Sequence, residues 1–455
     1  MPTYPALIAA AKSPADIFLT TRSQWEAGID VPRDLEALAR AQGFTGNGGE
    51  SVLCATSKGE VAAVLFGLGN GEDALAVAAL SNRLQAGDYK IAADGGLPLD
   101  HIAAGWVDGA YRFDRYLNDK AAPPRLVIGK GNAADAIIRE AVAVARLRDL
   151  VNTPAEDMGP VDIQATISDL AERYGASLDT IIGEALLVDN YPMVHAVGRA
   201  GPQEPRFMEL SWGDEAAPEL AIVGKGVAYD TGGLNLKGGA GMRLMKKDMG
   251  GSAHAIALAE LVMGANLPVR LKLYVPAVEN SISGTAFRPG DVLSSRKGLS
   301  VEIDNTDAEG RLILGDALAR ACESEPDLLI DFATLTGAAR IAVGPDLAPF
   351  FTDDEKLATA IARGATESGD PAWRLPLWDP YMSMLKSPIA DLVNSASGGM
   401  AGTITAALFL KQFVEAKAWV HLDVWAWRKG KYGRPEGGAA CGLRAMWATV
   451  QARYS

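Results

Sequence analysis

Segments with strand character alternate with segments of helical periodicity along the whole chain, and this alternation most limits the possible folds. Short apolar runs such as 220–223 and 328–333 read as buried strands, whereas 252–263 and 312–322 read as helices. Such alternation favours an α/β architecture. We expect a smaller N-terminal α/β domain over residues 1–148. A larger C-terminal α/β domain with a central mixed sheet is expected over residues 149–455.

The remaining expected elements support the same division of the chain. The helix at 132–150 runs into Pro154, which stops it, and the domain boundary is placed in or near this helix. Further strands are expected at 61–66, 125–128, 271–275, 299–304 and 419–424, and further helices at 72–84, 161–174, 403–414 and 441–450. Glycine clusters follow several of these strands, where ligands bind in open α/β sheets.

Charge and cysteine content exclude several classes of partner. The net charge of −13 over 455 residues argues against broad binding to nucleic acid or to membrane surfaces. The three cysteines, Cys54, Cys322 and Cys441, form no CxxC pair, which fits a reducing cytoplasm. The N-terminus lacks signal-peptide features, and no apolar run approaches the roughly 20 residues that span a bilayer. We expect a cytoplasmic protein with neither membrane nor nucleic-acid partners.

The stretch NTDAEGR, from Asn305 to Arg311, concentrates charged groups between an expected strand and an expected helix. In extended backbone, residues two apart project to one face, so Asp307, Glu309 and Arg311 are expected to point the same way. Two carboxylates held together need a compensating cation. One arginine meets this need in part, and a metal ion meets it more fully.

A glycine-rich stretch upstream, from Val223 to His254, carries four further polar groups. These are Lys225, Asp230, Lys237 and Asp248, each beside glycine or in a loop after apolar residues. Glycine allows the backbone to turn tightly and to approach a ligand. Together with NTDAEGR, this stretch provides four carboxylates and two lysines that could converge.

The residue types indicate which metal chemistry is possible. None of the four histidines shows an HExxH or another two-histidine spacing, so a histidine-rich zinc site is disfavoured. Oxygen-rich sites suit manganese, magnesium or zinc in a paired arrangement, with carboxylates bridging the two ions. A lysine beside two dications can lose its proton, and Lys225 could then be a neutral ligand.

Simpler roles are open for each of these residues taken singly. Asp248 could cap the following helix, and Asp307 to Arg311 could form a surface salt bridge at a helix start. The fragments at Lys225 and at 67–71 resemble phosphate loops but complete neither GxxxxGK[ST] nor GxGxxG. Nucleotide binding is therefore not expected.

The motifs VGKG, YDTGG, LKGG, KDMGG and NTDAEGR, in this order and spacing, resemble the leucyl aminopeptidase family of dinuclear metallo-exopeptidases, peptidase family M17. The resemblance covers roughly residues 150–450 and includes PAVENSISGTAFRPGDV, ATLTGA, AGTITAALFL and WVHLDVWAW. The N-terminal third resembles the family only in outline. Tyr229, Thr231 and Gly238 depart from the usual family pattern.

The resemblance implies a role for each motif residue. Lys225, Asp230, Asp248 and Glu309 would hold one divalent ion, and Asp230, Asp307 and Glu309 would hold the other. Lys237 would face the scissile carbonyl, and Arg311 would anchor a bicarbonate ion that acts as general base. The substrate pocket would include Met245, Asn305, Thr334 and Gly337.

The resemblance also implies an activity, cofactors and an assembly. It implies a metal-dependent aminopeptidase that releases N-terminal leucine and similar apolar residues from peptides, with two Mn²⁺ or Zn²⁺ ions, as a homohexamer. Two other functions are considered. One is a catalytically silent relative that binds DNA or acts as a scaffold. The other is a dinuclear phosphoesterase, because such metal pairs also cleave phosphate esters.

Overall fold

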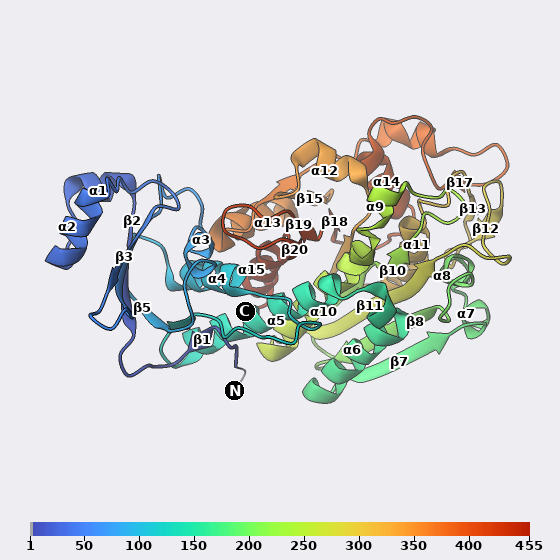
Figure 1. Ribbon diagram of the computed structural model, residues 1–455. Coiled ribbons are helices and arrows are strands. Elements are labelled where there is room, and N and C mark those ends of the chain that lie inside the picture. Colours follow the sequence, from blue (N-terminus) through green and yellow to red (C-terminus); the bar gives the residue numbers. More distant parts are fainter. Residues whose placement is uncertain (1–2) are drawn as a thin grey trace. The chain divides into compact units, whose positions relative to one another are not determined.

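The computed structural model describes residues 3–455, which form two compact units, each with its own sheet (Figure 1). The first unit contains the chain up to Ala145 together with Arg428–Gly437, and the second contains Arg146–Trp427 together with Gly438–Ser455. Helix α5 (Asn132–Asn152) carries the chain from one unit into the other. The assignment of domains to 1–148 and 149–455 stays a prediction.

The first unit is built on a six-stranded sheet with the strand order β1-β6-β5-β2-β4-β3. All neighbouring strands pair in parallel except β3 and β4. The strands are β1 (Leu7–Ile8), β2 (Ala15–Thr20), β3 (Ser51–Ala55), β4 (Val61–Gly67), β5 (Asp88–Asp94) and β6 (Arg125–Val127). The helices are α1 (Arg22–Ala27), α2 (Arg33–Ala41), α3 (Ala78–Ser81) and α4 (Leu99–Ala110).

A short segment from late in the chain completes this first unit. Within Arg428–Gly437, Arg428 donates to Asp108 at 2.8 Å, and the Arg434 guanidinium pairs with Asp73 at 2.6 Å. Gly433 has φ +74° and lies so close to Ala79 that an added Cβ would fall 2.0 Å from the Ala79 Cα. Glycine is therefore the residue that this contact permits.

The second unit is built on a nine-stranded mixed sheet, ordered β16-β15-β18-β14-β9-β11-β8-β7, with β10 paired to β11. Its strands are β7 (Ser177–Ile182), β8 (Arg206–Trp212), β9 (Glu219–Gly224), β10 (Gly226–Asp230), β11 (Arg270–Asn280), β14 (Leu328–Ala333), β15 (Ala348–Phe351), β16 (Ala372–Arg374) and β18 (Trp419–Asp423). Strands β9, β14 and β18 are parallel, so their carboxyl ends share one edge. The expected α/β fold with a central mixed sheet is confirmed.

Two groups of helices pack on this sheet. Helix α10 contacts β9, β11, β14, α6 and α15, and helix α11 contacts the same three strands together with α8 and α14, so the two groups cover its two faces (Figure 1). The helices are α6 (Pro160–Tyr174), α7 (Ala185–Val188), α8 (Pro192–Gly198), α9 (Gly239–Met242), α10 (Gly250–Gly264), α11 (Gly310–Cys322), α12 (Gly337–Val343), α13 (Glu355–Ser368), α14 (Gly402–Lys411) and α15 (Leu443–Tyr454). Almost every side chain of α10 is buried, which explains why its apolar run shows no polar face.

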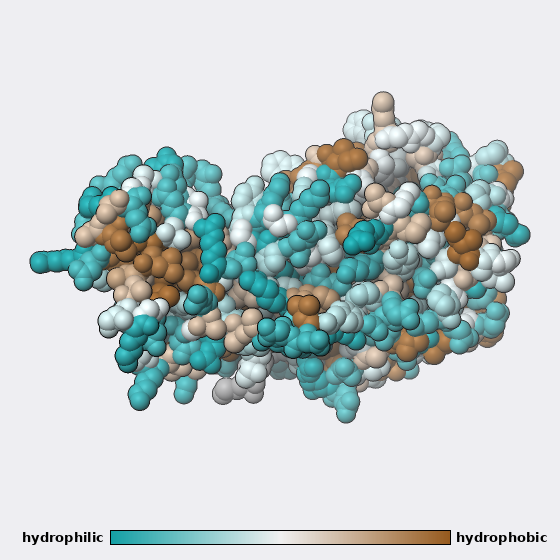
Figure 2. Space-filling model, in the orientation of Figure 1, coloured by the Kyte–Doolittle hydropathy of each residue, from teal (hydrophilic) through white to brown (hydrophobic). Residues whose placement is uncertain are grey.

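Small elements complete the described chain. A three-stranded sheet contains β12 (Val292–Ser294), β13 (Ser300–Glu302) and β17 (Leu392–Val393), and a two-stranded sheet contains β19 (Trp427–Arg428) and β20 (Gly437–Gly438). The 3₁₀ helices are η1 (Ala155–Asp157), η2 (Met245–Met249) and η3 (Asp379–Leu385). Most of the face shown in Figure 2 is hydrophilic, with separate apolar patches. No helix within residues 3–455 combines the length and the apolar character needed to cross a membrane.

One expected helix is largely absent. The segment 72–84 contains only α3, and the residues before it form successive turns closed by hydrogen bonds between residues three apart. Helix α4 packs tightly against these turns and against α3, and a Cβ at Gly105 would fall 2.9 Å from the Leu75 carbonyl oxygen. A Cβ at Gly109 would fall 2.1 Å from the Ala78 carbonyl oxygen. Tertiary packing thus overrides the helical periodicity of this segment, as it often does for short elements.

Candidate functional site

A cavity of about 640 Å³ in the second unit brings the predicted site residues together. All eleven of them line it: Lys225, Asp230, Lys237, Met245, Asp248, Asn305, Asp307, Glu309, Arg311, Thr334 and Gly337. The side chains come from segments more than 100 residues apart in the sequence. The cavity is thus a product of the fold.

The parallel strands of the central sheet place several of these residues. Lys225 follows β9 directly, Asp230 is the last residue of β10, and Thr334 follows β14. Because β9 and β14 are parallel, their carboxyl ends deliver Lys225 and Thr334 to the same edge. The Lys225 Nζ donates to the Thr334 carbonyl oxygen at 2.9 Å.

The NTDAEGR loop differs from the extended backbone expected from the sequence. Asp307 lies in a turn, and Glu309 has helical dihedral angles (φ −73°, ψ −35°) immediately before α11, so the expected alternation of side chains is wrong here. A residue distant in the sequence stabilises the turn. Asn394 Oδ1 accepts from the Asp304 and Asn305 backbone N–H groups, at 2.9 and 3.2 Å.

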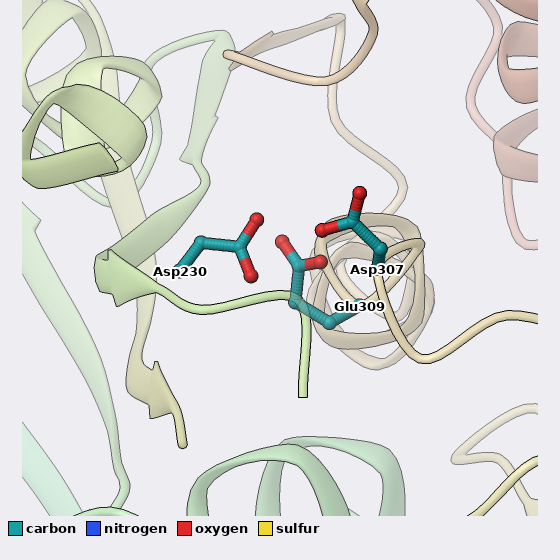
Figure 3. A group of neighbouring side chains, drawn as sticks. All are labelled: Asp230, Asp307 and Glu309. Carbon is teal, nitrogen blue, oxygen red and sulfur yellow. The ribbon is translucent and has the colours of Figure 1, made fainter. Parts of the chain in front are cut away.

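Three carboxylates nevertheless converge. Asp230, Asp307 and Glu309 each place one oxygen within 4.8 Å of the others, and their side chains point toward a common centre (Figure 3). The Asn280 amide donates to Asp230 Oδ1 at 2.8 Å and to the Thr306 carbonyl at 3.0 Å. Asn280 therefore fixes the end of β10 against the NTDAEGR loop.

Two lysines lie among the carboxylates. The Lys225 ammonium pairs with Asp248 Oδ2 and lies 3.1 Å from Glu309 Oε1. The Lys237 ammonium pairs with Asp307 Oδ1 and lies 2.8 Å from Asp230 Oδ2. Burial acts to lower the pKa of both lysines, but the surrounding carboxylates outweigh burial and raise it. Both lysines are therefore positively charged in this arrangement.

The site still carries more negative charge than these lysines compensate. Burial, followed by repulsion from Asp230, raises the pKa of Glu309 to about 8 and that of Asp307 to about 6. Glu309 Oε2 is buried and accepts no hydrogen bond from residues 3–455. Carboxylates in this state are suited to divalent cations, since oxygen-rich clusters bind them. The donor set thus fits the metal ions expected from the sequence.

Asp248 does not cap the helix that follows it. The residue preceding α10 is Met249, which makes no side-chain cap. The Asp248 carboxylate instead accepts from Lys225 and from the Thr334 hydroxyl, the latter at 2.9 Å. It therefore faces the cavity, beside the group formed by Asp230, Asp307 and Glu309.

Arg311 is buried at the back of the cavity. Its Nη1 donates to the Asn394 carbonyl at 2.7 Å, whereas its Nε is buried and has no hydrogen-bond partner within residues 3–455. Burial lowers the pKa of Arg311 to about 10, which still leaves it charged at neutral pH. An unsatisfied, buried N–H of a guanidinium is suited to an anion.

Several residues that shape the site were not expected from the sequence. Asn280 and Asn394 each act through one side-chain amide. Asn394 belongs to none of the quoted motifs, and Asn280 lies within the run 276–292 of the family resemblance, where no role was assigned to it. Lys247, Arg340 and Trp425 also line the cavity. Lys247 lies within the KDMGG motif and Trp425 lies within the run WVHLDVWAW. Both residues therefore belong to segments of the family resemblance, but the sequence did not indicate that they line the cavity.

Comparisons with known proteins agree with this arrangement. The sequence pattern of the cytosol aminopeptidase family catalytic domain matches residues 145–447, and that of the M17 aminopeptidase N-terminal domain matches residues 21–129. A probable cytosol aminopeptidase from Syntrophotalea carbinolica is 39% identical over 469 aligned positions, covering 93% of this chain and 94% of that protein.

Solved structures show the same fold. A cytosol aminopeptidase from Coxiella burnetii has a TM-score of 0.92 at 39% identity, covering 99% of this chain and all of the other. The bottromycin maturation enzyme BotP, solved in complex with Mn, has a TM-score of 0.87 at 33% identity, covering 97% and 100% of the two chains. The chain therefore belongs to the cytosol aminopeptidase family, M17.

Proposed function

We propose that the protein is a metal-dependent aminopeptidase that releases N-terminal residues from peptides. The observation that carries this proposal is the convergence of Asp230, Asp307 and Glu309 in one cavity, with Lys237 against the same oxygens. Family membership supports the same reaction. Leucine and similar apolar residues are the expected N-terminal substrates.

The ligand sets follow from the positions of the carboxylates. Lys225, Asp230, Asp248 and Glu309 would hold one ion, and Asp230, Asp307 and Glu309 would hold the other. Two divalent cations supply activation of water and polarisation of the peptide carbonyl when bound. Mn²⁺ or Zn²⁺ is expected, and BotP is a relative whose structure contains Mn. For Lys225 to act as a neutral ligand, the charge of the cations must overcome the carboxylates that raise its pKa.

Lys237 would stabilise the transition state. Its ammonium is held by the Asp230 and Asp307 carboxylates, and its side chain is 18% exposed in the cavity wall. A fixed, charged donor of this kind interacts more strongly as negative charge develops on the carbonyl oxygen. Its raised pKa keeps the proton on Nζ, so Lys237 would act as an electrostatic clamp and not as a base.

Arg311 would anchor a bicarbonate ion that accepts the proton of the attacking water. Replacement of Arg311 by alanine should lower kcat by about 10²-fold, the lower end of the usual contribution of a general base. The measurement is kcat in CO₂-depleted buffer with and without added bicarbonate. Bicarbonate should raise the wild-type rate and should not restore the variant. Full activity of the variant would remove the anion-anchor role.

A kinetic panel tests the proposed function. Leucyl, alanyl and glutamyl amides and a chromogenic phosphate ester should be assayed side by side with manganese, zinc, magnesium and cobalt. Release of free amine from the aminoacyl amides, abolished by a chelator and restored by a metal, is expected. Cleavage of the phosphate ester alone would instead identify a dinuclear phosphoesterase.

A catalytically silent protein that binds DNA or acts as a scaffold is less favoured. Every proposed metal-ligand position carries a side chain that can bind a metal ion, so the ligand set is complete. Assembly into a homohexamer and a cytoplasmic location remain predictions of the family resemblance. Sedimentation of the metal-loaded protein measures the first, and fractionation of the source cells measures the second.

A further inference from the structure

The wall of the cavity that contains the proposed metal ligands also holds two cationic side chains over one aromatic ring. The Trp425 indole is half-buried, with Lys247 Nζ 4.2 Å and Arg340 Cζ 4.1 Å from its ring centroid. Both distances are within the range of a cation–π interaction. All three residues line the same cavity as Asp248 and Thr334.

The other cations of the cavity already have partners. Lys225 and Lys237 pair with the four carboxylates, and the Arg311 Nη1 donates to a backbone carbonyl. Lys247 is only 3% exposed and lies 3.8 Å from Asp248 Oδ1. The three lysines are therefore engaged by the site itself, and the free Nε of Arg311 is assigned to the proposed bicarbonate.

Arg340 differs from them in two ways. It is exposed, on α12, one turn after Gly337, and its guanidinium makes no ion pair or hydrogen bond with the side or main chains of residues 3–455. The cation–π contact with Trp425 holds the guanidinium in place while its N–H donors stay available. A planar guanidinium held in this way binds a carboxylate through two parallel hydrogen bonds.

We propose that Arg340, positioned by Trp425, receives a carboxylate of the peptide substrate, so that the enzyme favours anionic peptides over neutral peptides of the same size. This inference rests on the proposed aminopeptidase function. The carboxylate has three possible sources in a short peptide. These are the side chain of an acidic N-terminal residue, the side chain of the next residue, and the C-terminus.

Three pairs of substrates that differ only in charge distinguish these sources. They are the coumaryl amides of L-glutamate and L-glutamine, the amidated dipeptides Ala-Glu and Ala-Gln, and Ala-Ala with a free or an amidated C-terminus. The manganese-loaded wild-type enzyme should show a charged-to-neutral ratio of kcat/KM of about 10 or more in at least one pair. The pair that responds identifies the source.

Variants assign the preference to Arg340. Arg340→Gln should bring the ratio close to 1, and Arg340→Lys should restore part of it. Trp425→Leu should lower the ratio because the guanidinium is no longer held, whereas Trp425→Phe, which keeps an aromatic face, should retain most of it. Arg363→Gln is the matched control. Arg363 is an exposed arginine on α13 that pairs with Glu367 and does not line the cavity, so the ratio should stay at the wild-type value.

A ratio that stays near 1 in all three wild-type pairs, or that is unchanged in Arg340→Gln, would overturn the inference while turnover of the neutral substrates still supported the aminopeptidase. Absence of turnover for all six substrates would instead overturn the proposed function, and the inference with it. If Trp425→Phe lowered the charged-to-neutral ratio of kcat/KM as much as Trp425→Leu does, the aromatic ring would have no positioning role.

Discussion

Replacement of Lys237 by methionine is expected to leave the metal content unchanged and to lower kcat by about 10²- to 10³-fold, the usual cost of removing one preorganised donor from a developing oxyanion. The reason is that Lys237 is charged, is held by Asp230 and Asp307, and belongs to neither proposed ligand set. The measurements are kcat on a leucyl amide and metal per chain after dialysis.

Lys272→Met is a matched control for this variant. Lys272 is a largely buried lysine of β11 that pairs with Glu209 at 2.7 Å and does not line the cavity. Its replacement removes a lysine ion pair of similar burial and should keep the wild-type kcat. Wild-type turnover in Lys237→Met would exclude the electrostatic role, and loss of metal there would move Lys237 into the ligand shell.

Replacement of Glu309 by glutamine is expected to have opposite effects on the metal-free and metal-loaded protein. Glu309 has an ordinary pKa of 4.5, which burial and Asp230 raise to about 8 in the folded chain. The folded state therefore binds this proton more tightly than the unfolded state does. In the metal-free protein, stability is lost as pH rises from about 4.5 to about 8 and is level beyond that range.

The glutamine side chain cannot ionise, so it removes this loss. Metal-free Glu309→Gln should melt above metal-free wild type, by a margin that grows between pH 5 and pH 8 and reaches the order of a few kcal/mol. In saturating Mn²⁺ the order should reverse, because binding to the folded state stabilises only the protein that keeps the ligand. Thermal melts with chelator and with Mn²⁺, at several pH values, measure both effects.

Asp316→Asn provides the contrast. Asp316 is also fully buried, and burial raises its pKa to about 7, but its carboxylate accepts from the backbone of Met193, Val194 and Arg296 outside the cavity. This variant should change the melting temperature without changing the stabilisation by Mn²⁺. If Glu309→Gln were stabilised by Mn²⁺ as strongly as wild type, Glu309 would not be a ligand.

The elements of the fold and the residues of the site could be predicted from the sequence to different extents. Strands such as β14 and helices such as α11 were predicted closely. A short apolar run indicates a buried strand, whereas a longer run with helical periodicity indicates a helix. The prediction of a helix over residues 72–84 was wrong because packing against α4 determines the conformation of this segment. The motif residues line one cavity, as the order of the motifs and the family resemblance led us to expect, and their roles stay predictions. The extended backbone expected for NTDAEGR was wrong.

The supporting residues could not be found in this way. The Asn280 amide makes two hydrogen bonds, one of them to the Asp230 carboxylate, and the Asn394 amide makes four hydrogen bonds to the backbone of residues 304–308. The partners of both lie far away in the sequence. Arg340 and Trp425 are adjacent only because β14 and β18 are neighbours in the sheet. Such contacts depend on the register of strands, which a single sequence does not specify.

The segment Arg428–Gly437 has a consequence for how the protein can be divided. It begins three residues after Trp425, yet it is part of the first unit, with its arginines on Asp73 and Asp108. A fragment that starts at Arg146 would keep this segment and lose the surface on which it packs, and a fragment that ends at Ala145 would lose the segment itself. The two units are interleaved along the polypeptide, so a gene cut at the apparent junction yields two incomplete pieces.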